Sequence, residues 1–296
     1  MSLRLEMLQV ARLSRSQLGD DASGLVEKFV RSQLQRDGGF GDRDEGADLY
    51  YTVFGLDALT ALQVDLPAET LSYLQSFEQG DALDFVHLCC LARALSNYPD
   101  QAERAAPVLK NIETQFRSAD GGYNQIESAP TGSAYASFLA FGAYSDHGLS
   151  VPNPDGVTAS LTSLRTPSGG WANDTLIPVP NAPATAAAVA VGRNLDLAPA
   201  ELGPPAVEFL LSCFHPESGG FVPFPGAPLP DLLTTAVALH ALDGLQAPIA
   251  PIKEACLDFI DTLWTADGGF HGSWEDDDLD LEYTYYGLLA LGHLAL

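Results

Sequence analysis

Apolar positions along the chain recur at helical spacing, in pairs of stretches separated by a polar, glycine-rich turn. Leu25, Phe29, Val30 and Leu34 follow this spacing before the first such turn, and residues 50–62 continue it afterwards. No stretch carries the alternation of apolar and polar residues that is typical of a strand. Each pair of stretches therefore predicts a helical hairpin.

The hairpins repeat along the whole chain. A Gly-Gly-aromatic tripeptide marks five of the turns, as Gly38-Gly39-Phe40, Gly121-Gly122-Tyr123, Gly169-Gly170-Trp171, Gly219-Gly220-Phe221 and Gly268-Gly269-Phe270. The second glycines are spaced by 83, 48, 50 and 49 residues, and the double-length first interval holds a degenerate turn at residues 80–87. The sequence therefore predicts six units.

The two helices of each unit differ in polarity. First helices carry charge, as at Glu27, Lys28 and Arg31, whereas second helices such as 134–144 and 182–191 carry almost none. A charged face suits an outer ring, and a helix that is apolar all round must be buried. We therefore predict an all-α fold, an α/α toroid of six hairpins with concentric inner and outer rings.

Domain boundaries follow from this repeat. Because each hairpin contacts only its neighbours, residues 21–296 are expected to form one domain. Leu3, Met7 and Val10 share one helical face, so residues 1–20 are expected to form an N-terminal arm or helix lying against the body.

Charge and composition exclude several classes of function. The 39 acidic residues outnumber 14 Lys and Arg, for a net charge of −25, which disfavours nucleic acids and anionic membrane surfaces. No apolar run reaches the roughly 18 residues of a membrane span. The 4 cysteines show no CxxC spacing and indicate free thiols in a reducing compartment, so a cytoplasmic protein is expected.

The repeat resembles the β subunits of protein prenyltransferases and, more distantly, the squalene and hopene cyclases that share their toroid. The resemblance covers roughly residues 20–296 and is strongest in the first and last units. Gly38-Gly39-Phe40 with Asp48-Leu49-Tyr50-Tyr51-Thr52, and Gly268-Gly269-Phe270 with Asp280-Leu281-Glu282-Tyr283-Thr284, look like the family's turn and the start of its inner helix. This resemblance implies an isoprenoid diphosphate or another apolar small molecule as ligand, and a helical-repeat partner subunit.

The family's zinc ligands, an Asp, a Cys and a His, match Asp231, Leu233 and Tyr283 here. Two of the three are therefore not retained. Carboxylates and a histidine of units six, one and two could instead gather at one mouth of a closed ring. Asp48, His87, Asp280 and Glu282 are the predicted metal ligands, with Asp84 beside them, and their oxygen-rich set suits Mg²⁺ or Zn²⁺. The alternative is that each Asp caps a helix.

Aromatic side chains gather on the second helices. Such a lining fits an isoprenoid chain, because ring faces contact prenyl methyl groups and stabilise cationic transition states. We expect substrate contacts from Arg43, Tyr50, Tyr51, Tyr135, Phe138 and Tyr283, and catalytic roles for Asp280, Glu282 and His87. The alternative is packing between the two rings.

Three functions stay open from the sequence. The first is prenyl transfer with a metal at the mouth and Arg43 on the diphosphate. The second is a non-catalytic toroid that serves as a binding or scaffold protein, with its cavity filled by its own side chains. The third is a reduced terpene cyclase, which would need an acid deep in the cavity with a raised pKa, and Glu282 is its candidate.

Overall fold

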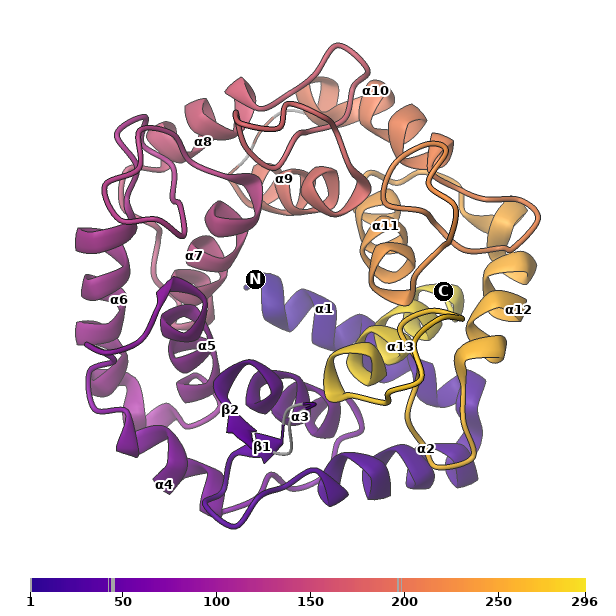
Figure 1. Ribbon diagram of the computed structural model, residues 1–296, viewed down its shortest axis with the longest axis horizontal. Helices are drawn as coiled ribbons and strands as arrows, with labels where there is room; N and C mark the ends of the chain where they lie inside the picture. The colour runs from indigo at the N-terminus through magenta and orange to yellow at the C-terminus, as the bar shows by residue number, and fades with distance from the viewer. Residues whose placement is uncertain (1, 42, 44–45, 196, 198) are drawn as a thin grey trace.

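Two concentric rings of helices form the fold in the computed structural model, which describes residues 2–41, 43, 46–195, 197 and 199–296 (Figure 1). The predicted α/α toroid is confirmed. The inner ring is made of α3 (Leu49–Ala61), α5 (Phe85–Leu95), α7 (Ala134–Asp146), α9 (Ala182–Asn194), α11 (Leu232–Gly244) and α13 (Leu281–Leu294). The outer ring is made of α2 (Arg15–Ser32), α4 (Glu69–Ser76), α6 (Ala102–Phe116), α8 (Pro154–Ser163), α10 (Pro199–Ser212) and α12 (Lys253–Leu263).

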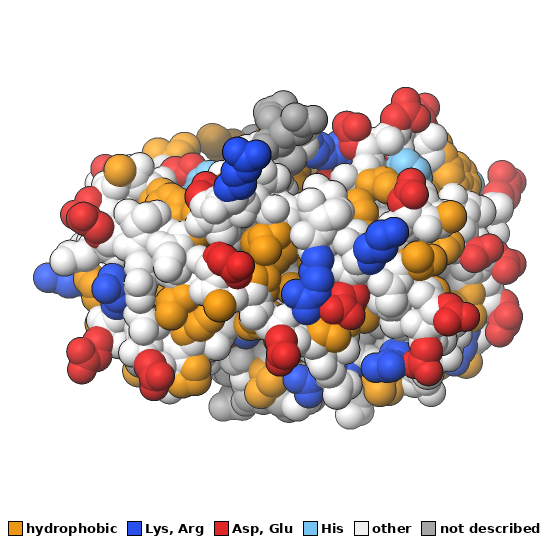
Figure 2. All heavy atoms as spheres, turned by 90° about the horizontal axis from the view of Figure 1, so that it is seen from below, with side chains coloured by type: hydrophobic (Ala, Val, Ile, Leu, Met, Phe, Trp, Pro, Cys, Tyr) orange, Lys and Arg blue, Asp and Glu red, His pale blue; other side chains and the backbone are white. Residues whose placement is uncertain are grey.

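Each inner helix packs against the next, and α13 packs against α3, which closes the ring. Short 3-10 helices connect some units, at η1 (Arg12–Ser14), η2 (Pro99–Gln101) and η3 (Ala250–Ile252). None of the described helices is long and apolar enough to cross a lipid bilayer. On the side face in Figure 2, acidic side chains stand dispersed among basic and neutral ones, so the negative charge is spread over this surface.

The structure contains a short β-hairpin, although the sequence pattern predicted no strands. Strands β1 (Phe40–Gly41) and β2 (Ala47–Asp48) pair antiparallel, with Phe40 opposite Asp48. Each strand has two residues, too few for any alternation of polarity to be read. The pairing arises because the turn folds back onto the start of its own inner helix.

A hydroxyl group joins most turns to their inner helices. The backbone N–H of the turn aromatic donates to a Thr hydroxyl in the first turn of the inner helix, as in Phe40 to Thr52 at 2.9 Å and Phe221 to Thr235 at 2.9 Å. That hydroxyl in turn donates to the carbonyl of the helix cap, as in Thr52 to Asp48 at 2.6 Å. The same arrangement recurs at Trp171 with Thr185 and at Phe270 with Thr284. These contacts bring the inner-helix N-termini to one rim of the ring.

The caps themselves are carboxylates in four units. Asp48, Asp84, Asp231 and Asp280 each accept a hydrogen bond from a backbone N–H in the first turn of α3, α5, α11 and α13. Such a cap satisfies N–H groups that have no partner within the helix. Capping is therefore one role of all four residues.

The first glycine of each Gly-Gly turn is required by close approach. Gly268 has φ +94°, and a Cβ there would lie 2.1 Å from the carbonyl oxygen of Leu25 in α2. This contact joins the last unit to the first. No side chain fits at such a distance, and the conformation itself disfavours L residues.

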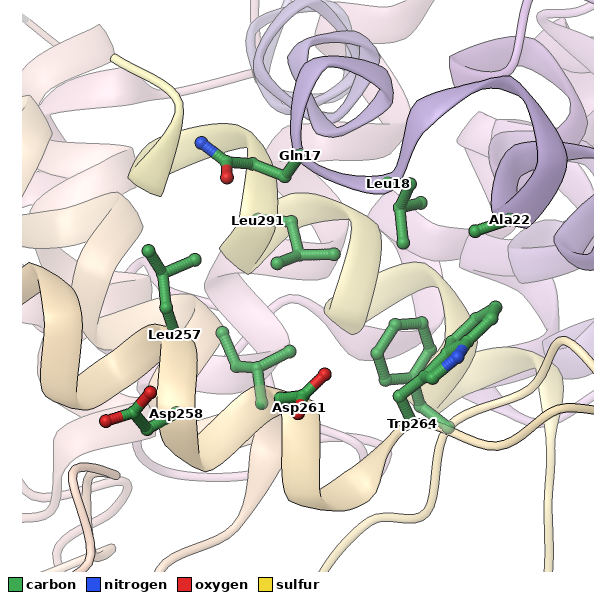
Figure 3. Close-up of a pocket in the computed structure, with 10 residues that line it drawn as sticks. Gln17, Leu18, Ala22, Leu257, Asp258, Asp261, Trp264 and Leu291 are labelled. Atoms are coloured by element: carbon green, nitrogen blue, oxygen red, sulfur yellow. The ribbon is translucent and has the colours of Figure 1, made fainter.

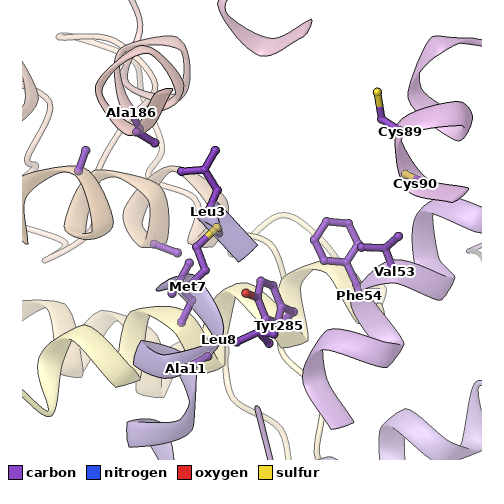
Figure 4. Close-up of a cluster of buried hydrophobic side chains, with 14 of the residues drawn as sticks. Leu3, Met7, Leu8, Ala11, Val53, Phe54, Cys89, Cys90, Ala186 and Tyr285 are labelled. Carbon is purple, nitrogen blue, oxygen red and sulfur yellow. The ribbon is translucent and has the colours of Figure 1, made fainter. Parts of the chain in front are cut away.

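The N-terminal helix α1 (Leu3–Ala11) lies across the centre of the ring (Figure 1). Leu3, Met7 and Leu8 are buried, and their side chains lie among residues of the inner ring such as Phe54 and Tyr285 (Figure 4). Arg4 pairs with Asp57 of α3 at 2.6 Å, and Glu6 pairs with Arg193 of α9 at 2.8 Å. The helix therefore packs against the body from within the ring and fills part of its centre.

We predict that Gly268→Ala lowers the free energy of unfolding by about 3 kcal/mol, because it adds an overpacking cost to the cost of a left-handed backbone. Gly226→Ala is the matched control, since Gly226 also has a positive φ, +88°, but has nothing within 4 Å of an added Cβ. The control should lose about 1 kcal/mol. Urea unfolding of both variants measures the difference, and equal losses would contradict the ring-closing role.

Candidate functional site

A cavity of about 240 Å³ lies in the centre of the ring. Aromatic side chains line one part of it, and small aliphatic ones line the part formed by α9 and α11. The described lining residues are Met7, Tyr50, Tyr135, Phe138, Pro183, Ala186, Ala187, Ala190, Leu233, Val237, His240, Glu282 and Tyr286. Of these, Glu282 alone is acidic, so one carboxyl group shares the cavity with apolar side chains, tyrosines and His240.

A narrower hollow of about 50 Å³ shares Met7, Tyr50, Tyr135, Phe138 and Tyr286 with this cavity. Polar side chains of α1, α5 and α7 line its other wall, namely Arg4, Arg93 and Asp146. Both arginines donate to Asp57, Arg4 at 2.6 Å and Arg93 at 2.7 Å. Their charges are therefore partnered by a carboxylate that is only 1% exposed.

Glu282 enters the cavity from the first turn of α13. Its Oε1 accepts a hydrogen bond of 2.6 Å from the Tyr50 hydroxyl of α3. Burial raises the pKa of Glu282 to about 7, because a charged carboxylate is poorly solvated there, and the negative charge of Asp280 acts in the same direction. Near neutral pH the group can therefore either give or take a proton.

The predicted mouth cluster divides into separate hydrogen-bonded groups, one around Arg43 and one around His87. Arg43 donates to Asp280 at 2.8 Å and to Asp276 at 2.8 Å, and its guanidinium lies 5.6 Å from the centre of the Tyr283 ring. Asp276 belongs to the acidic run Glu275-Asp276-Asp277-Asp278 and is a partner of the arginine that was expected to bind a diphosphate.

His87 forms the second pair of contacts. Its Nε2 lies 3.0 Å from Asp48 and its Nδ1 lies 2.9 Å from Asp84. These hydrogen bonds, the one to Asp48 above all, raise the pKa of His87 to about 9. At neutral pH the imidazole is therefore protonated on both nitrogens and has no lone pair to offer to a metal.

Within the described ranges, no group of three or more His, Cys, Asp or Glu side chains is arranged to hold a metal ion. Asp48 and His87 bond to one another, Asp280 bonds to Arg43, and Glu282 bonds to Tyr50. At the positions of the family's zinc ligands, Asp231 accepts from the Thr234 hydroxyl and Leu233 lines the cavity. These residues do not fit the family's zinc, and a metal at the mouth stays a prediction.

The residues expected to contact substrate lie in two places. Tyr50, Tyr135 and Phe138 line the cavity. Tyr51 and Tyr283 lie at the mouth, close enough to Arg43 for its charge to act on the pKa of both hydroxyls. The contribution of α9 to the cavity wall was not predicted. Its alanine-rich sequence is a usable signal, because small side chains on an inner helix leave space that larger ones would fill.

A larger hollow of about 400 Å³ lies on the outside of the toroid, between α2, α12 and α13 (Figure 3). Leu18, Leu257 and Leu291 point into it, with Asp258 and Asp261 along one side. It is more open than the central cavity, and none of its described lining residues belongs to the predicted site. The central cavity is therefore the stronger candidate site.

The family model of the prenyltransferase alpha-alpha toroid domain matches residues 7–87 and 187–295. No curated protein sequence matches the chain. Several solved structures share its fold.

A GH76A alpha-1,6-mannanase from Salegentibacter sp. HEL1_6 is 14% identical, with a TM-score of 0.63 over 93% of this chain and 98% of its own. The type II terpene cyclase MstE from Scytonema is 14% identical, with a TM-score of 0.57 over 96% of this chain and 98% of its own. The Candida albicans protein geranylgeranyltransferase-I complexed with GGPP is 13% identical, with a TM-score of 0.53 over 99% of this chain and 83% of its own. At these identities the likeness shows a shared fold, on which unrelated chemistries occur.

We predict that Glu282 and His87 each make stability depend on pH, in different windows. Both have raised pKa values, so the folded state binds each proton more tightly than the unfolded chain does. The contribution of Glu282 is complete below its ordinary pKa of 4.5 and is lost as the pH rises through 7. That of His87 is complete below 6.5 and is lost as the pH rises through 9.

The variants Glu282→Gln and His87→Gln serve as controls for each other in urea unfolding at a series of pH values. Glu282→Gln should remove a fall of about 3 kcal/mol between pH 4.5 and 7, and His87→Gln should flatten the curve between pH 6.5 and 9. If the free energy of unfolding of both variants depends on pH as it does in the unmodified protein, the pKa values of Glu282 and His87 are not raised.

Proposed function

Because the chain belongs to the prenyltransferase alpha-alpha toroid family, we propose that its central cavity binds an isoprenoid and that Glu282 exchanges a proton with it. The observation that carries this proposal is the position of Glu282, a buried carboxyl whose pKa is raised to about 7, in an aromatic-lined cavity of about 240 Å³. This is the acid that a reduced terpene cyclase requires. It makes that function the best supported of the three.

The size of the cavity points to a short ligand. Its volume lies below the range of about 300–1,000 Å³ that is common for drug-sized ligands. A chain of ten or fifteen carbons therefore suits it better than a chain of twenty. An open cavity also supports ligand binding over the scaffold function, for which the protein's own side chains would fill the centre.

The charges around the site favour an uncharged ligand over a diphosphate. Arg43 is engaged by Asp276 and Asp280, and Arg4 and Arg93 are engaged by Asp57. A diphosphate would have to displace a carboxylate from one of these arginines, against a net charge of −25. Prenyl transfer, with its diphosphate, its metal and a helical-repeat partner subunit, stays a prediction from the family resemblance.

Proton transfer can proceed with the residues present. The O–H bond of Glu282 breaks, its proton adds to one carbon of an isoprenoid double bond, and the π electrons form the new C–H bond. The other carbon becomes cationic, and the faces of Tyr135 and Tyr286 can stabilise it. The Tyr50 hydroxyl, already 2.6 Å from Glu282, stabilises the carboxylate that remains.

We predict that purified protein binds farnesol, with no metal requirement, and binds geranylgeraniol and farnesyl diphosphate at least tenfold more weakly. Titration calorimetry with and without Mg²⁺ or Zn²⁺ measures these affinities. Tighter, metal-dependent binding of the diphosphate would instead support prenyl transfer, and no binding of any of these ligands would support the scaffold function.

A pair of cavity-filling variants locates the ligand. Ala186→Phe places a ring in the central cavity and should weaken farnesol binding at least tenfold. Ala22→Phe places the same ring in the outer hollow and should leave binding unchanged, since Ala22 lines that hollow. The opposite result would move the binding site to the outside of the toroid.

A further inference from the structure

Two histidines lie in contact inside the inner ring. Nδ1 of His240, in α11, lies 3.0 Å from Nε2 of His293, in α13. The two residues are 6% and 1% exposed. Buried imidazoles are costly to desolvate, and neither residue takes part in the chemistry described above.

The pair connects to the outside through a carboxylate. Nδ1 of His293 lies 3.5 Å from Asp243, whose side chain is 45% exposed. The charge of Arg193 of α9 also acts on His240, and Arg193 bonds to Glu6 of α1 at 2.8 Å. A line of polar atoms thus runs from solvent at Asp243, through His293, to His240.

The carboxylate of Asp243 favours one tautomer of each imidazole. Attraction between His293 and Asp243 lowers the pKa of the carboxyl, so Asp243 is a carboxylate that favours a proton on Nδ1 of His293. Nε2 of His293 is then an acceptor, and Nδ1 of His240 donates to it. Burial lowers the pKa of His240 to about 3, so the ring is neutral and its Nε2 keeps a lone pair.

His240 lines the same cavity as Glu282, and its Nε2 is a buried atom with no hydrogen-bond partner in the part of the chain that the structure describes. Polar atoms that are buried without a partner are rare and call for an explanation. His240 stands nine residues after the cap of α11, whereas Glu282 stands two residues after the cap of α13. At 1.5 Å per residue, His240 therefore lies about 10 Å deeper than Glu282.

We propose that Nε2 of His240 is the hydrogen-bond and proton acceptor at the deep end of the cavity, with His293 and Asp243 as positioning residues that hold it in the acceptor tautomer. This inference rests on the proposed function and adds a second reacting group to it. An acceptor at this place selects an isoprenoid whose hydroxyl group lies about 10 Å from the double bond at Glu282. During reaction, the same acceptor can take a proton from a cationic intermediate.

The proton balance closes without any further reagent. After Glu282 has protonated a double bond, a C–H bond next to the cationic carbon breaks, and its electron pair forms a new double bond. Nε2 of His240 takes that proton. His240 then gives the Nε2 proton to water when the product leaves, so Nδ1 keeps its proton and the acceptor tautomer is restored, while Glu282 regains a proton from water at the mouth.

The first test uses ligands that differ only in the hydroxyl group. The unmodified protein should bind farnesol at least tenfold more tightly than farnesene, and His240→Phe should reduce this ratio to about one. His240→Gln, which keeps an acceptor, should restore part of the ratio, and His215→Gln, on the outside of the ring, should not change it. An unchanged ratio in His240→Phe would overturn the proposal.

A second test needs neither a ligand nor a change at His240. In ¹⁵N-histidine NMR spectra at neutral pH, Nε2 of His240 should have the shift of an unprotonated nitrogen, and Asp243→Asn should move the ring toward a mixture of tautomers. A protonated Nε2 in the unmodified protein would overturn the proposal. If this spectrum is as expected but no isoprenoid binds, the proposed function fails and the arrangement of the two histidines stands.

Discussion

The hydroxyl groups that join the Gly-Gly turns to the inner helices are the interaction on which the rest of the structure depends. In four units a threonine accepts from the turn and donates to the carbonyl of the helix cap, as Thr284 does between Phe270 and Asp280. The turn, the cap and the first residues of the inner helix are thereby fixed together at one rim. Glu282 owes its place at the cavity to this arrangement, since it stands two residues after such a cap and two before such a hydroxyl.

The second unit shows what happens without this contact. It has lost the Gly pair, and Leu88 stands four residues after its cap where the other turns have a hydroxyl. The space beside Gly80 is filled by Leu88, since a Cβ on Gly80 would lie 2.6 Å from that side chain. His87 of this unit bonds to the cap of its own helix and to Asp48 of the neighbouring one, so a polar contact supplements the packing here.

The features that could be predicted from the sequence are those for which a short local segment determines the local structure. A glycine pair, a capping aspartate and an uncharged helix each have a local physical cause, so the toroid, the caps and the two rings could be predicted. Contacts between units could not, because they depend on rotamers and on ring closure. The bond from Tyr50 to Glu282, the engagement of Arg43 by Asp276, and the contact of His240 with His293 all join residues more than 50 positions apart. Helix α1 was expected to lie against the body, but its apolar face gives no information on which surface of the body it covers.

The central claim is that Glu282 is a buried acid in a cavity that takes an apolar ligand. The most direct test is the pKa of Glu282, measured by ¹³C NMR on protein labelled at the glutamate carboxyl groups, with Glu282→Gln to assign the signal and with and without farnesol. The account predicts a pKa near 7 in the free protein and a further rise when farnesol excludes water from the carboxyl group. A pKa near 4.5 that farnesol does not change would contradict it.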